Sequence, residues 1–192
     1  MTDQSQSATR PPAPAKVKIL VTADRLFYED GVHTVGVDRI IAQSHVTKAT
    51  FYKHYRSKDV LIAAFVAGRD AQARAAVAAD EERSNDPAAV LGAIVDGFAA
   101  ESQRDGYRGC PFINAQMSQL DAAGPVTPAV TAWRTWLRST LVDLFAKAGS
   151  ADPQAAADDL LLSRDGAFGG APVTDPGVAD AALHRTLARL LP

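Results

Sequence analysis

The stretch TVGVDRIIAQSHVTKATFYKHYRSKDVL, Thr34 to Leu61, contains two short helical patterns separated by a turn of a few residues. The first helix is expected at about Val37 to Ser44, with Ile40 and Ile41 as its apolar contacts. The second is expected at Lys48 to Tyr55. A helix, a tight turn and a second short helix form the helix-turn-helix layout, whose second helix enters the major groove of DNA. The stretch therefore predicts a DNA-reading module.

The second of these helices is expected to have two unlike sides. Phe51 and Tyr55 are four residues apart and share a face, so we expect them in the core with Ile40 and Val46. Thr47 is the expected N-cap, and the outward positions are Lys48, Thr50, Tyr52, Lys53 and His54. Lysine can donate to guanine, threonine can touch a thymine methyl, and tyrosine can donate to phosphate. An ordinary solvated helix with a lysine-rich face is the alternative that composition leaves open.

The order of residues in this stretch strongly resembles the DNA-binding signature of TetR-family transcriptional regulators. The shared features are an Ile-Ala-containing helix, a Val in the turn, a Thr-aromatic-Tyr step and a Ser-Lys-Asp step, and the similarity extends from about residue 16 to 65. The resemblance implies that the outward residues lie in or beside the groove and that Lys58 holds a phosphate at the start of the next helix. Two positions depart from the family pattern: Gly36 stands where Thr or Ser often caps a helix, and His45 where glycine often makes the turn. We therefore expect His45 to adopt a positive φ, which histidine tolerates better than most residues.

The rest of the chain predicts an all-α fold of about nine helices. Residues 1–15 are polar and then proline-rich, which favours a disordered arm. From Lys16 an apolar pattern of Val17, Leu20, Ala23 and Phe27 predicts a helix that Gly31 ends. We expect the DNA-binding domain at 16–58 and a C-terminal effector-binding and dimerisation domain at 59–192.

Start signals for helices recur in that second domain. Ser57 is expected to cap a helix that continues toward Arg83. Three Asp-Pro steps, at 86–87, 152–153 and 175–176, each place a capping carboxylate before a proline suited to the first helical turn. A longer helix is expected from Val126, and no alternating strand pattern or fixed repeat is present.

Composition narrows the class of protein. The net charge of -2 divides unevenly, since residues 1–58 hold nine Lys and Arg against five Asp and Glu, and the remainder holds 11 against 17. A positive first module would attract a polyanion such as double-stranded DNA. The single cysteine, Cys110, excludes an internal disulfide, and no apolar run approaches the length of a membrane span. We expect a cytoplasmic protein that does not enter a membrane.

The segment YRGCPFINAQMSQL, Tyr107 to Leu120, is the other distinctive stretch, and a similar Gly-Cys-Pro-Phe segment occurs in a subset of TetR-like regulators. A mostly apolar pocket is expected here, lined by Phe98, Cys110, Phe112, Asn114, Met117, Trp133 and Trp136. Plain core packing is the alternative for each of them. Cys110 is either a redox sensor or a small buried hydrophobe.

The family resemblance also implies a homodimer and a small-molecule effector. The dimer is expected to form through the last two helices, about Pro153 to Phe168 and Pro176 to Leu191, with an intrachain core as the alternative. Neither a catalytic residue, a metal site nor a cofactor is expected, because the four histidines lack metal-ligand spacing and the segment GAFGGA at 166–171 is not a phosphate loop. The expected function is a ligand-responsive repressor on a palindromic operator. An activator, a ligand-independent regulator, and a small-molecule or thiol-dependent protein without DNA function are the alternatives.

Overall fold

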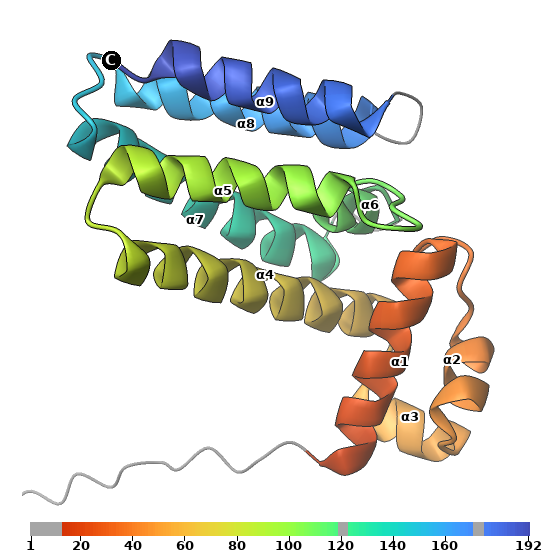
Figure 1. Ribbon diagram of the computed structural model, residues 1–192. Coiled ribbons are helices and arrows are strands. Elements are labelled where there is room, and N and C mark those ends of the chain that lie inside the picture. Colours follow the sequence, from red (N-terminus) through yellow and green to blue (C-terminus); the bar gives the residue numbers. More distant parts are fainter. Residues whose placement is uncertain (1–12, 119–122, 171–174) are drawn as a thin grey trace, which may run out of the picture.

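The computed structural model describes residues 13–118, 123–170 and 175–192, and within them the chain forms nine helices and no strand. This confirms the predicted all-α fold. The helices are α1 (Pro14–Asp30), α2 (Val37–Ser44), α3 (Lys48–His54), α4 (Lys58–Arg83), α5 (Pro87–Ser102), α6 (Pro111–Ser118), α7 (Val126–Lys147), α8 (Pro153–Gly170) and α9 (Pro176–Leu190) (Figure 1). In the described helices, none is both long enough and apolar enough for a membrane span.

Local chemistry explains where several helices start. The carboxylates of Asp86, Asp152 and Asp175 accept hydrogen bonds from the backbone N–H groups of Ala88, Ala155 and Gly177, at 3.0, 3.0 and 2.8 Å. These bonds satisfy donors that the first turn of a helix leaves without an intrahelical partner. The three predicted Asp-Pro starts are therefore confirmed.

Helix α1 differs from its predicted form in two respects. It begins at Pro14, since proline suits the first turn of a helix, and the rest of the expected arm, residues 1–12, lies outside the described residues. The predicted apolar stripe was partly wrong, because Val17 is exposed while Ile19 and Leu26 are buried. Contacts of α1 with α2, α3 and α4 favour a face centred on Ile19, Ala23 and Leu26. Gly31 ends the helix with φ 87°, as expected.

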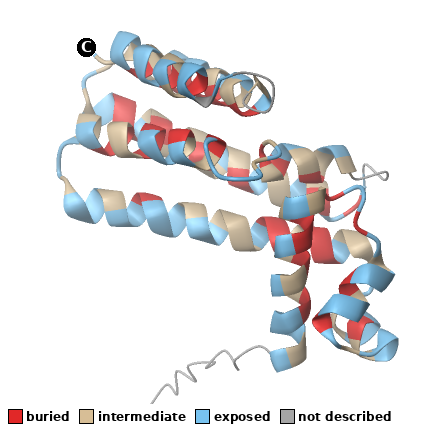
Figure 2. Cartoon of the chain, turned by 45° about the vertical axis from the view of Figure 1, so that its right-hand side comes forward, coloured by how far each residue is buried: buried red, intermediate tan, exposed pale blue. Residues whose placement is uncertain are grey.

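The C-terminal body is a layered bundle of long helices. Helices α8 and α9 contact each other and form the outer layer, α5 and α7 lie beneath them, and α4 forms the opposite layer (Figure 1). Buried residues lie on the sides of the helices that face their neighbours (Figure 2). The body therefore has a core between its layers.

Helix α4 joins the first module to this body. The hydroxyl of Ser57 caps it by accepting from the N–H of Val60 at 3.2 Å. Its N-terminal half buries four apolar side chains, Leu61, Ile62, Phe65 and Val66, and Figure 1 shows α1 standing across this end of α4. The Phe65 ring meets Phe27 of α1 edge-on with 5.5 Å between centroids. The core of the first module thus continues past residue 58 into α4.

Candidate functional site

A tight turn connects α2 and α3. His45 ends α2 with φ 53° and ψ 42°, in the left-handed region, and its N–H donates to the carbonyl of Ala42 at 3.3 Å. This confirms the positive φ expected where glycine is common. Gly36 is the N-cap of α2 and makes no side-chain cap hydrogen bond. Three residues, His45 to Thr47, separate the end of α2 from the start of α3.

Thr47 fixes the start of α3. Its hydroxyl oxygen accepts from the N–H of Thr50 at 3.1 Å and lies 2.8 Å from the Thr50 hydroxyl. A Thr at this position satisfies one of the free N–H groups of the first turn, so the predicted N-cap is confirmed. Both hydroxyl groups therefore lie together at the end of α3 that a helix dipole makes partly positive.

The inner face of α3 anchors it to the module. Phe51 and Tyr55 are completely or almost completely buried, as is Ile40 of α2, while Val46 is half-buried. The Tyr55 hydroxyl donates to the carbonyl of Lys16 at 3.3 Å, which ties the end of α3 to the start of α1. Burial raises the pKa of the Tyr55 phenol. The core positions predicted for α3 are confirmed.

The outer face of α3 gathers five of the predicted side chains. Lys48, Tyr52 and Lys53 are exposed and Thr50 and His54 are half-buried, with Tyr52 keeping 42 % of its surface accessible. The Lys48 ammonium lies 3.7 Å from an Asp38 carboxylate oxygen, and both side chains are largely solvated. An exposed ion pair of this kind holds Lys48 only weakly. The face is thus free to meet a partner, and it lies at the end of the molecule away from the body (Figure 1).

Lys58 is not brought together with these residues. Its ammonium donates to the carbonyl of Val32 at 2.7 Å, between the end of α1 and the start of α2. The side chain is half-buried, and this desolvation lowers the pKa of the Lys58 amine. In this conformation Lys58 holds the α1–α2 connection against α4, a role that the sequence pattern did not indicate.

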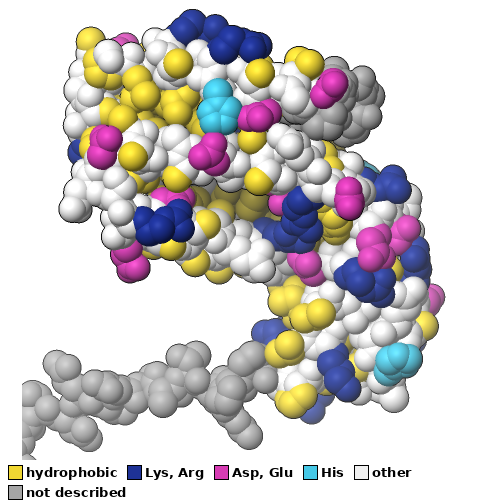
Figure 3. Space-filling view, viewed as in Figure 1, with side chains coloured by type: hydrophobic (Ala, Val, Ile, Leu, Met, Phe, Trp, Pro, Cys, Tyr) yellow, Lys and Arg dark blue, Asp and Glu magenta, His cyan; other side chains and the backbone are white. Residues whose placement is uncertain are grey.

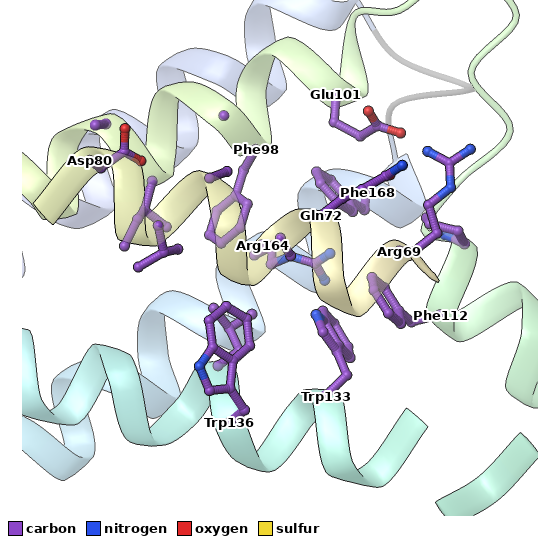
Figure 4. A pocket seen from close by; sticks show the side chains of 18 residues that line it. Arg69, Gln72, Asp80, Phe98, Glu101, Phe112, Trp133, Trp136, Arg164 and Phe168 are labelled. Atoms are coloured by element: carbon purple, nitrogen blue, oxygen red, sulfur yellow. The ribbon is translucent and has the colours of Figure 1, made fainter. Parts of the chain in front are cut away.

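The body contains a cavity of about 270 Å³ between α4, α5, α6, α7 and α8. Figure 3 shows the surface hollowed between α4 and α5, with hydrophobic side chains inside. Four of the seven residues predicted to line a pocket do line it: Phe98, Phe112, Trp133 and Trp136 (Figure 4). The volume of the cavity is slightly below the ~300–1,000 Å³ usual for small-molecule sites.

The other three predicted lining residues lie elsewhere. Cys110 is buried beside the cavity wall, and its sulfur lies 3.5 Å from a guanidinium nitrogen of Arg164. The Asn114 amide donates to the carbonyl of Arg108 at 2.8 Å, and Met117 is 71 % exposed. Asn114 and Met117 belong to α6, which presents only Pro111 and Phe112 to the cavity.

Flat aromatic surfaces form much of the cavity wall. The Phe112 and Trp133 rings stack with centroids 3.7 Å apart and planes at 4°. The Arg74 guanidinium lies 4.4 Å from the Trp136 ring, and the Phe98 and Phe168 rings meet edge-on. Such walls favour an apolar or aromatic ligand.

Sequence reasoning missed two walls of this cavity. One is the alanine-rich middle of α4, where Ala73 and Ala76 line the cavity, and the other contains Arg164 and Phe168 of α8. The run of small residues in α4 is the signal that could have indicated the first, because small side chains leave room between packed helices. Nothing in the local pattern of α8 indicates the second.

A metal centre would need several His, Cys, Asp or Glu side chains close together. Among the residues that the structure describes, no three His, Cys, Asp or Glu side chains come together as a possible metal site.

Comparisons with known proteins agree with this geometry. Residues 19–65 match the family model described as bacterial regulatory proteins, tetR family. The crystal structure of SCO4454, a TetR-family transcriptional regulator from Streptomyces coelicolor, is 36 % identical over 92 % of this chain and 95 % of that chain, with a TM-score of 0.84. No curated protein matches this chain.

Two more distant structures show the fold alone. A TetR-family regulator from Agrobacterium tumefaciens is 20 % identical, with a TM-score of 0.81 over 93 % of this chain and 98 % of that chain. SmeT, solved as a complex with triclosan, is 21 % identical, with a TM-score of 0.70 over 94 % of this chain and 93 % of that chain.

Proposed function

This chain belongs to the TetR family of transcriptional regulators, and we propose that it is a repressor that binds a palindromic operator as a homodimer and is released by a small-molecule effector. In the dimer, the two copies of α3 read half-sites about one helical turn of DNA apart. The proposed DNA contacts come from Thr47, Lys48, Thr50, Tyr52, Lys53 and His54, and from Lys58, which holds a phosphate at the start of α4.

The observation that carries the proposal is that α4 belongs both to the core of the first module and to the wall of the cavity in the body. Its N-terminal half packs into the first module, where Phe65 contacts Phe27, and its middle, including Ala73 and Ala76, lines the cavity of the body. At the boundary, the guanidinium of Arg69 makes a bidentate pair with Asp24 of α1, at 2.9 and 3.0 Å. Arg69 also lines the cavity. A ligand that displaces α4 therefore displaces α1 and, through it, the α2–α3 pair.

Release by an effector follows from differential affinity. The effector binds more tightly to the arrangement of α4 that is unsuited to DNA, and DNA then weakens effector binding by the same factor. The cavity supports an apolar effector of small size, and the SmeT structure holds triclosan within the same fold.

Gel shifts on promoter fragments from the protein's own chromosomal neighbourhood, with excess competitor DNA, test the regulator proposal. We expect a specific shift that weakens steeply when salt is raised, because lysine contacts to phosphate release counterions. A reporter gene behind the shifted fragment is expected to fall in expression when the protein is present. Failure of every fragment, followed by failure of a genome-wide selection for bound DNA, would refute operator binding, and a rise in reporter expression would refute repression.

Leu162→Asp tests the dimer through α8 and α9. Leu162 is 67 % exposed on the outer layer of the body, so a carboxylate there disturbs the single chain little. In a symmetric interface the same charge is buried twice, and each buried unpaired charge costs several kcal/mol. We expect this variant to sediment as a monomer at concentrations where the unchanged protein is a dimer.

Val21→Asp is the matched control for this experiment. Val21 is a similarly exposed apolar residue, at 63 %, but it belongs to α1. We expect the control to remain dimeric. Dimers of both variants with equal dissociation constants would exclude the outer face of α8 from the interface.

A further inference from the structure

Arg164 of α8 is a buried cation on the wall of the cavity. Only 3 % of its surface is exposed, and its guanidinium lies among aromatic rings in Figure 4. The guanidinium carbon is 4.1 Å from the Phe168 ring centroid, 5.0 Å from Trp133 and 5.1 Å from Phe98. Ring faces attract a cation, but they replace only part of the hydration that a buried charge loses.

The polar partners of Arg164 are incomplete. One terminal nitrogen donates to an Asp165 oxygen at 2.9 Å, and the other lies 3.5 Å from the Cys110 sulfur, which is a weak acceptor. The Nε–H group is buried and has no hydrogen-bond partner among the described residues. Nearly all buried polar groups in folded proteins have such a partner, so this donor indicates a place for an acceptor from outside the chain.

The charge around Arg164 is also unbalanced. The second oxygen of Asp165 lies 2.7 Å from the guanidinium of Arg134, so one carboxylate serves two cations. Arg164, Asp165 and Arg134 together therefore carry an excess positive charge. An anion in the cavity would neutralise it.

The other charged groups on the described cavity wall are paired. Arg69 pairs with Asp24, Asp80 with Arg83, and Glu101 with Arg104 at 2.9 Å. One oxygen of Glu101 is also buried without a hydrogen-bond partner, which favours a donor group near that edge of the cavity. The charge of Arg164 acts more strongly on a ligand in the cavity than the charge of Glu101 does. The Arg164 side chain is 4 % exposed against 26 % for Glu101, so water screens Glu101 more.

We propose that the effector is a small aromatic carboxylate whose carboxylate group binds the Arg164 guanidinium and whose ring lies against Phe98, Trp133 and Trp136. This inference rests on the proposed function, since it names the chemical class of the ligand that occupies the same cavity. A guanidinium presents adjacent N–H groups that match the two oxygens of a carboxylate. The aromatic walls accommodate the apolar part of the same molecule.

A matched set of three probes tests the charge preference: hydrocinnamate, the neutral hydrocinnamamide and the cationic phenylpropylammonium. Titration calorimetry measures affinity, and intrinsic fluorescence reports the location, because both tryptophans of the chain, Trp133 and Trp136, line the cavity. We expect hydrocinnamate to bind at least about tenfold more tightly than the amide, as a charge-assisted hydrogen bond provides, and to change the fluorescence. An amide or ammonium that binds as tightly as the carboxylate, or a set in which the carboxylate does not bind, overturns the proposal.

Two variants test whether Arg164 causes the preference for a carboxylate over the neutral amide. Arg164→Gln is expected to reduce the carboxylate-to-amide ratio to about one. Asp165→Asn removes the acid that partly neutralises Arg164 and is expected to raise carboxylate affinity several-fold, which keeps the proposal testable if Arg164→Gln does not fold. The control is Asp158→Asn, another α8 acid that pairs with Arg138 at 2.6 Å and does not line the cavity. It is expected to leave the ratio unchanged, and an equal rise in both variants contradicts the assignment.

Gel shifts without any probe separate this proposal from the regulator proposal. Specific operator binding combined with no preference for the carboxylate would refute the proposal of an aromatic carboxylate effector and would leave the regulator proposal standing. Tight carboxylate binding by a protein that binds no operator would support the proposed ligand site and refute the proposed repressor function.

Discussion

The double variant Lys48→Ala/Tyr52→Ala is expected to lose specific operator binding while its unfolding transition stays where it is. Both side chains are exposed on the outer face of α3, and Lys48 has only a solvated contact 3.7 Å from Asp38. Each contact to a base or phosphate is worth roughly 1–3 kcal/mol, and a dimer loses two contacts in each subunit. The affinity should therefore fall by at least on the order of 1,000-fold, measured by gel shift at fixed salt.

Lys147→Ala is the control for the change of charge. Lys147 is an exposed lysine in the last turn of α7, within the body rather than on α3. We expect it to change operator affinity by less than the Lys48 substitution does alone, because exposed charges beyond a Debye length of about 8 Å are largely screened. If the gel shifts of the double variant match those of the unchanged protein, the outer face of α3 does not make the proposed DNA contacts.

Phe51→Ala is expected to unfold the DNA-reading module instead of weakening its contacts. The Phe51 ring is fully buried, with centroids 5.3 Å from Tyr52 and 6.3 Å from Tyr55. Truncating a buried phenylalanine to alanine costs about 3–5 kcal/mol, which is much of the 5–15 kcal/mol that stabilises an ordinary domain. Amide hydrogen exchange across α1, α2 and α3 should accelerate strongly, and operator binding should fall with it.

The neighbouring residue provides the control. Tyr52→Ala removes an exposed aromatic ring from the next position in α3, and we expect exchange rates to remain within a few-fold of the original. Faster exchange in α5, α8 and α9 of the Phe51 variant would show that the module and the body unfold together. Unchanged exchange in α1 to α3 would contradict the anchoring role of Phe51.

The predicted elements that the structure confirmed depend on neighbours in the sequence. Thr47 caps α3 through the N–H of Thr50, Ser57 caps α4 through Val60, and His45 makes the turn with its own backbone angles. In each case the interacting groups are at most three residues apart. Sequence patterns predict such features well because the geometry of one turn of chain decides them.

The predictions that failed depend on contacts between distant residues. Val17 was expected in the core of α1 and is exposed, because contacts of α1 with three other helices set which face is buried. Asn114 and Met117 were expected on the cavity and lie outside it, because α6 presents only Pro111 and Phe112 to the cavity. The contact of the Lys58 ammonium with the carbonyl of Val32, 26 residues earlier in the chain, was likewise not indicated by the sequence, and the phosphate contact of Lys58 stays a prediction.

By itself the sequence determined the family resemblance, the all-α fold and the positions of α2 and α3, because helix caps and apolar periodicity act over one or two turns of chain. Only the tertiary structure decided the composition of the cavity and the environment of Arg164. Its partners come from α5, α7, α8 and Cys110, which precedes α6, and the nearest ring outside α8 belongs to a residue 31 positions away. Helical periodicity predicts which side of a helix is apolar, but the packing of the layers decides which neighbour that side meets and whether a buried charge there finds its counter-ion.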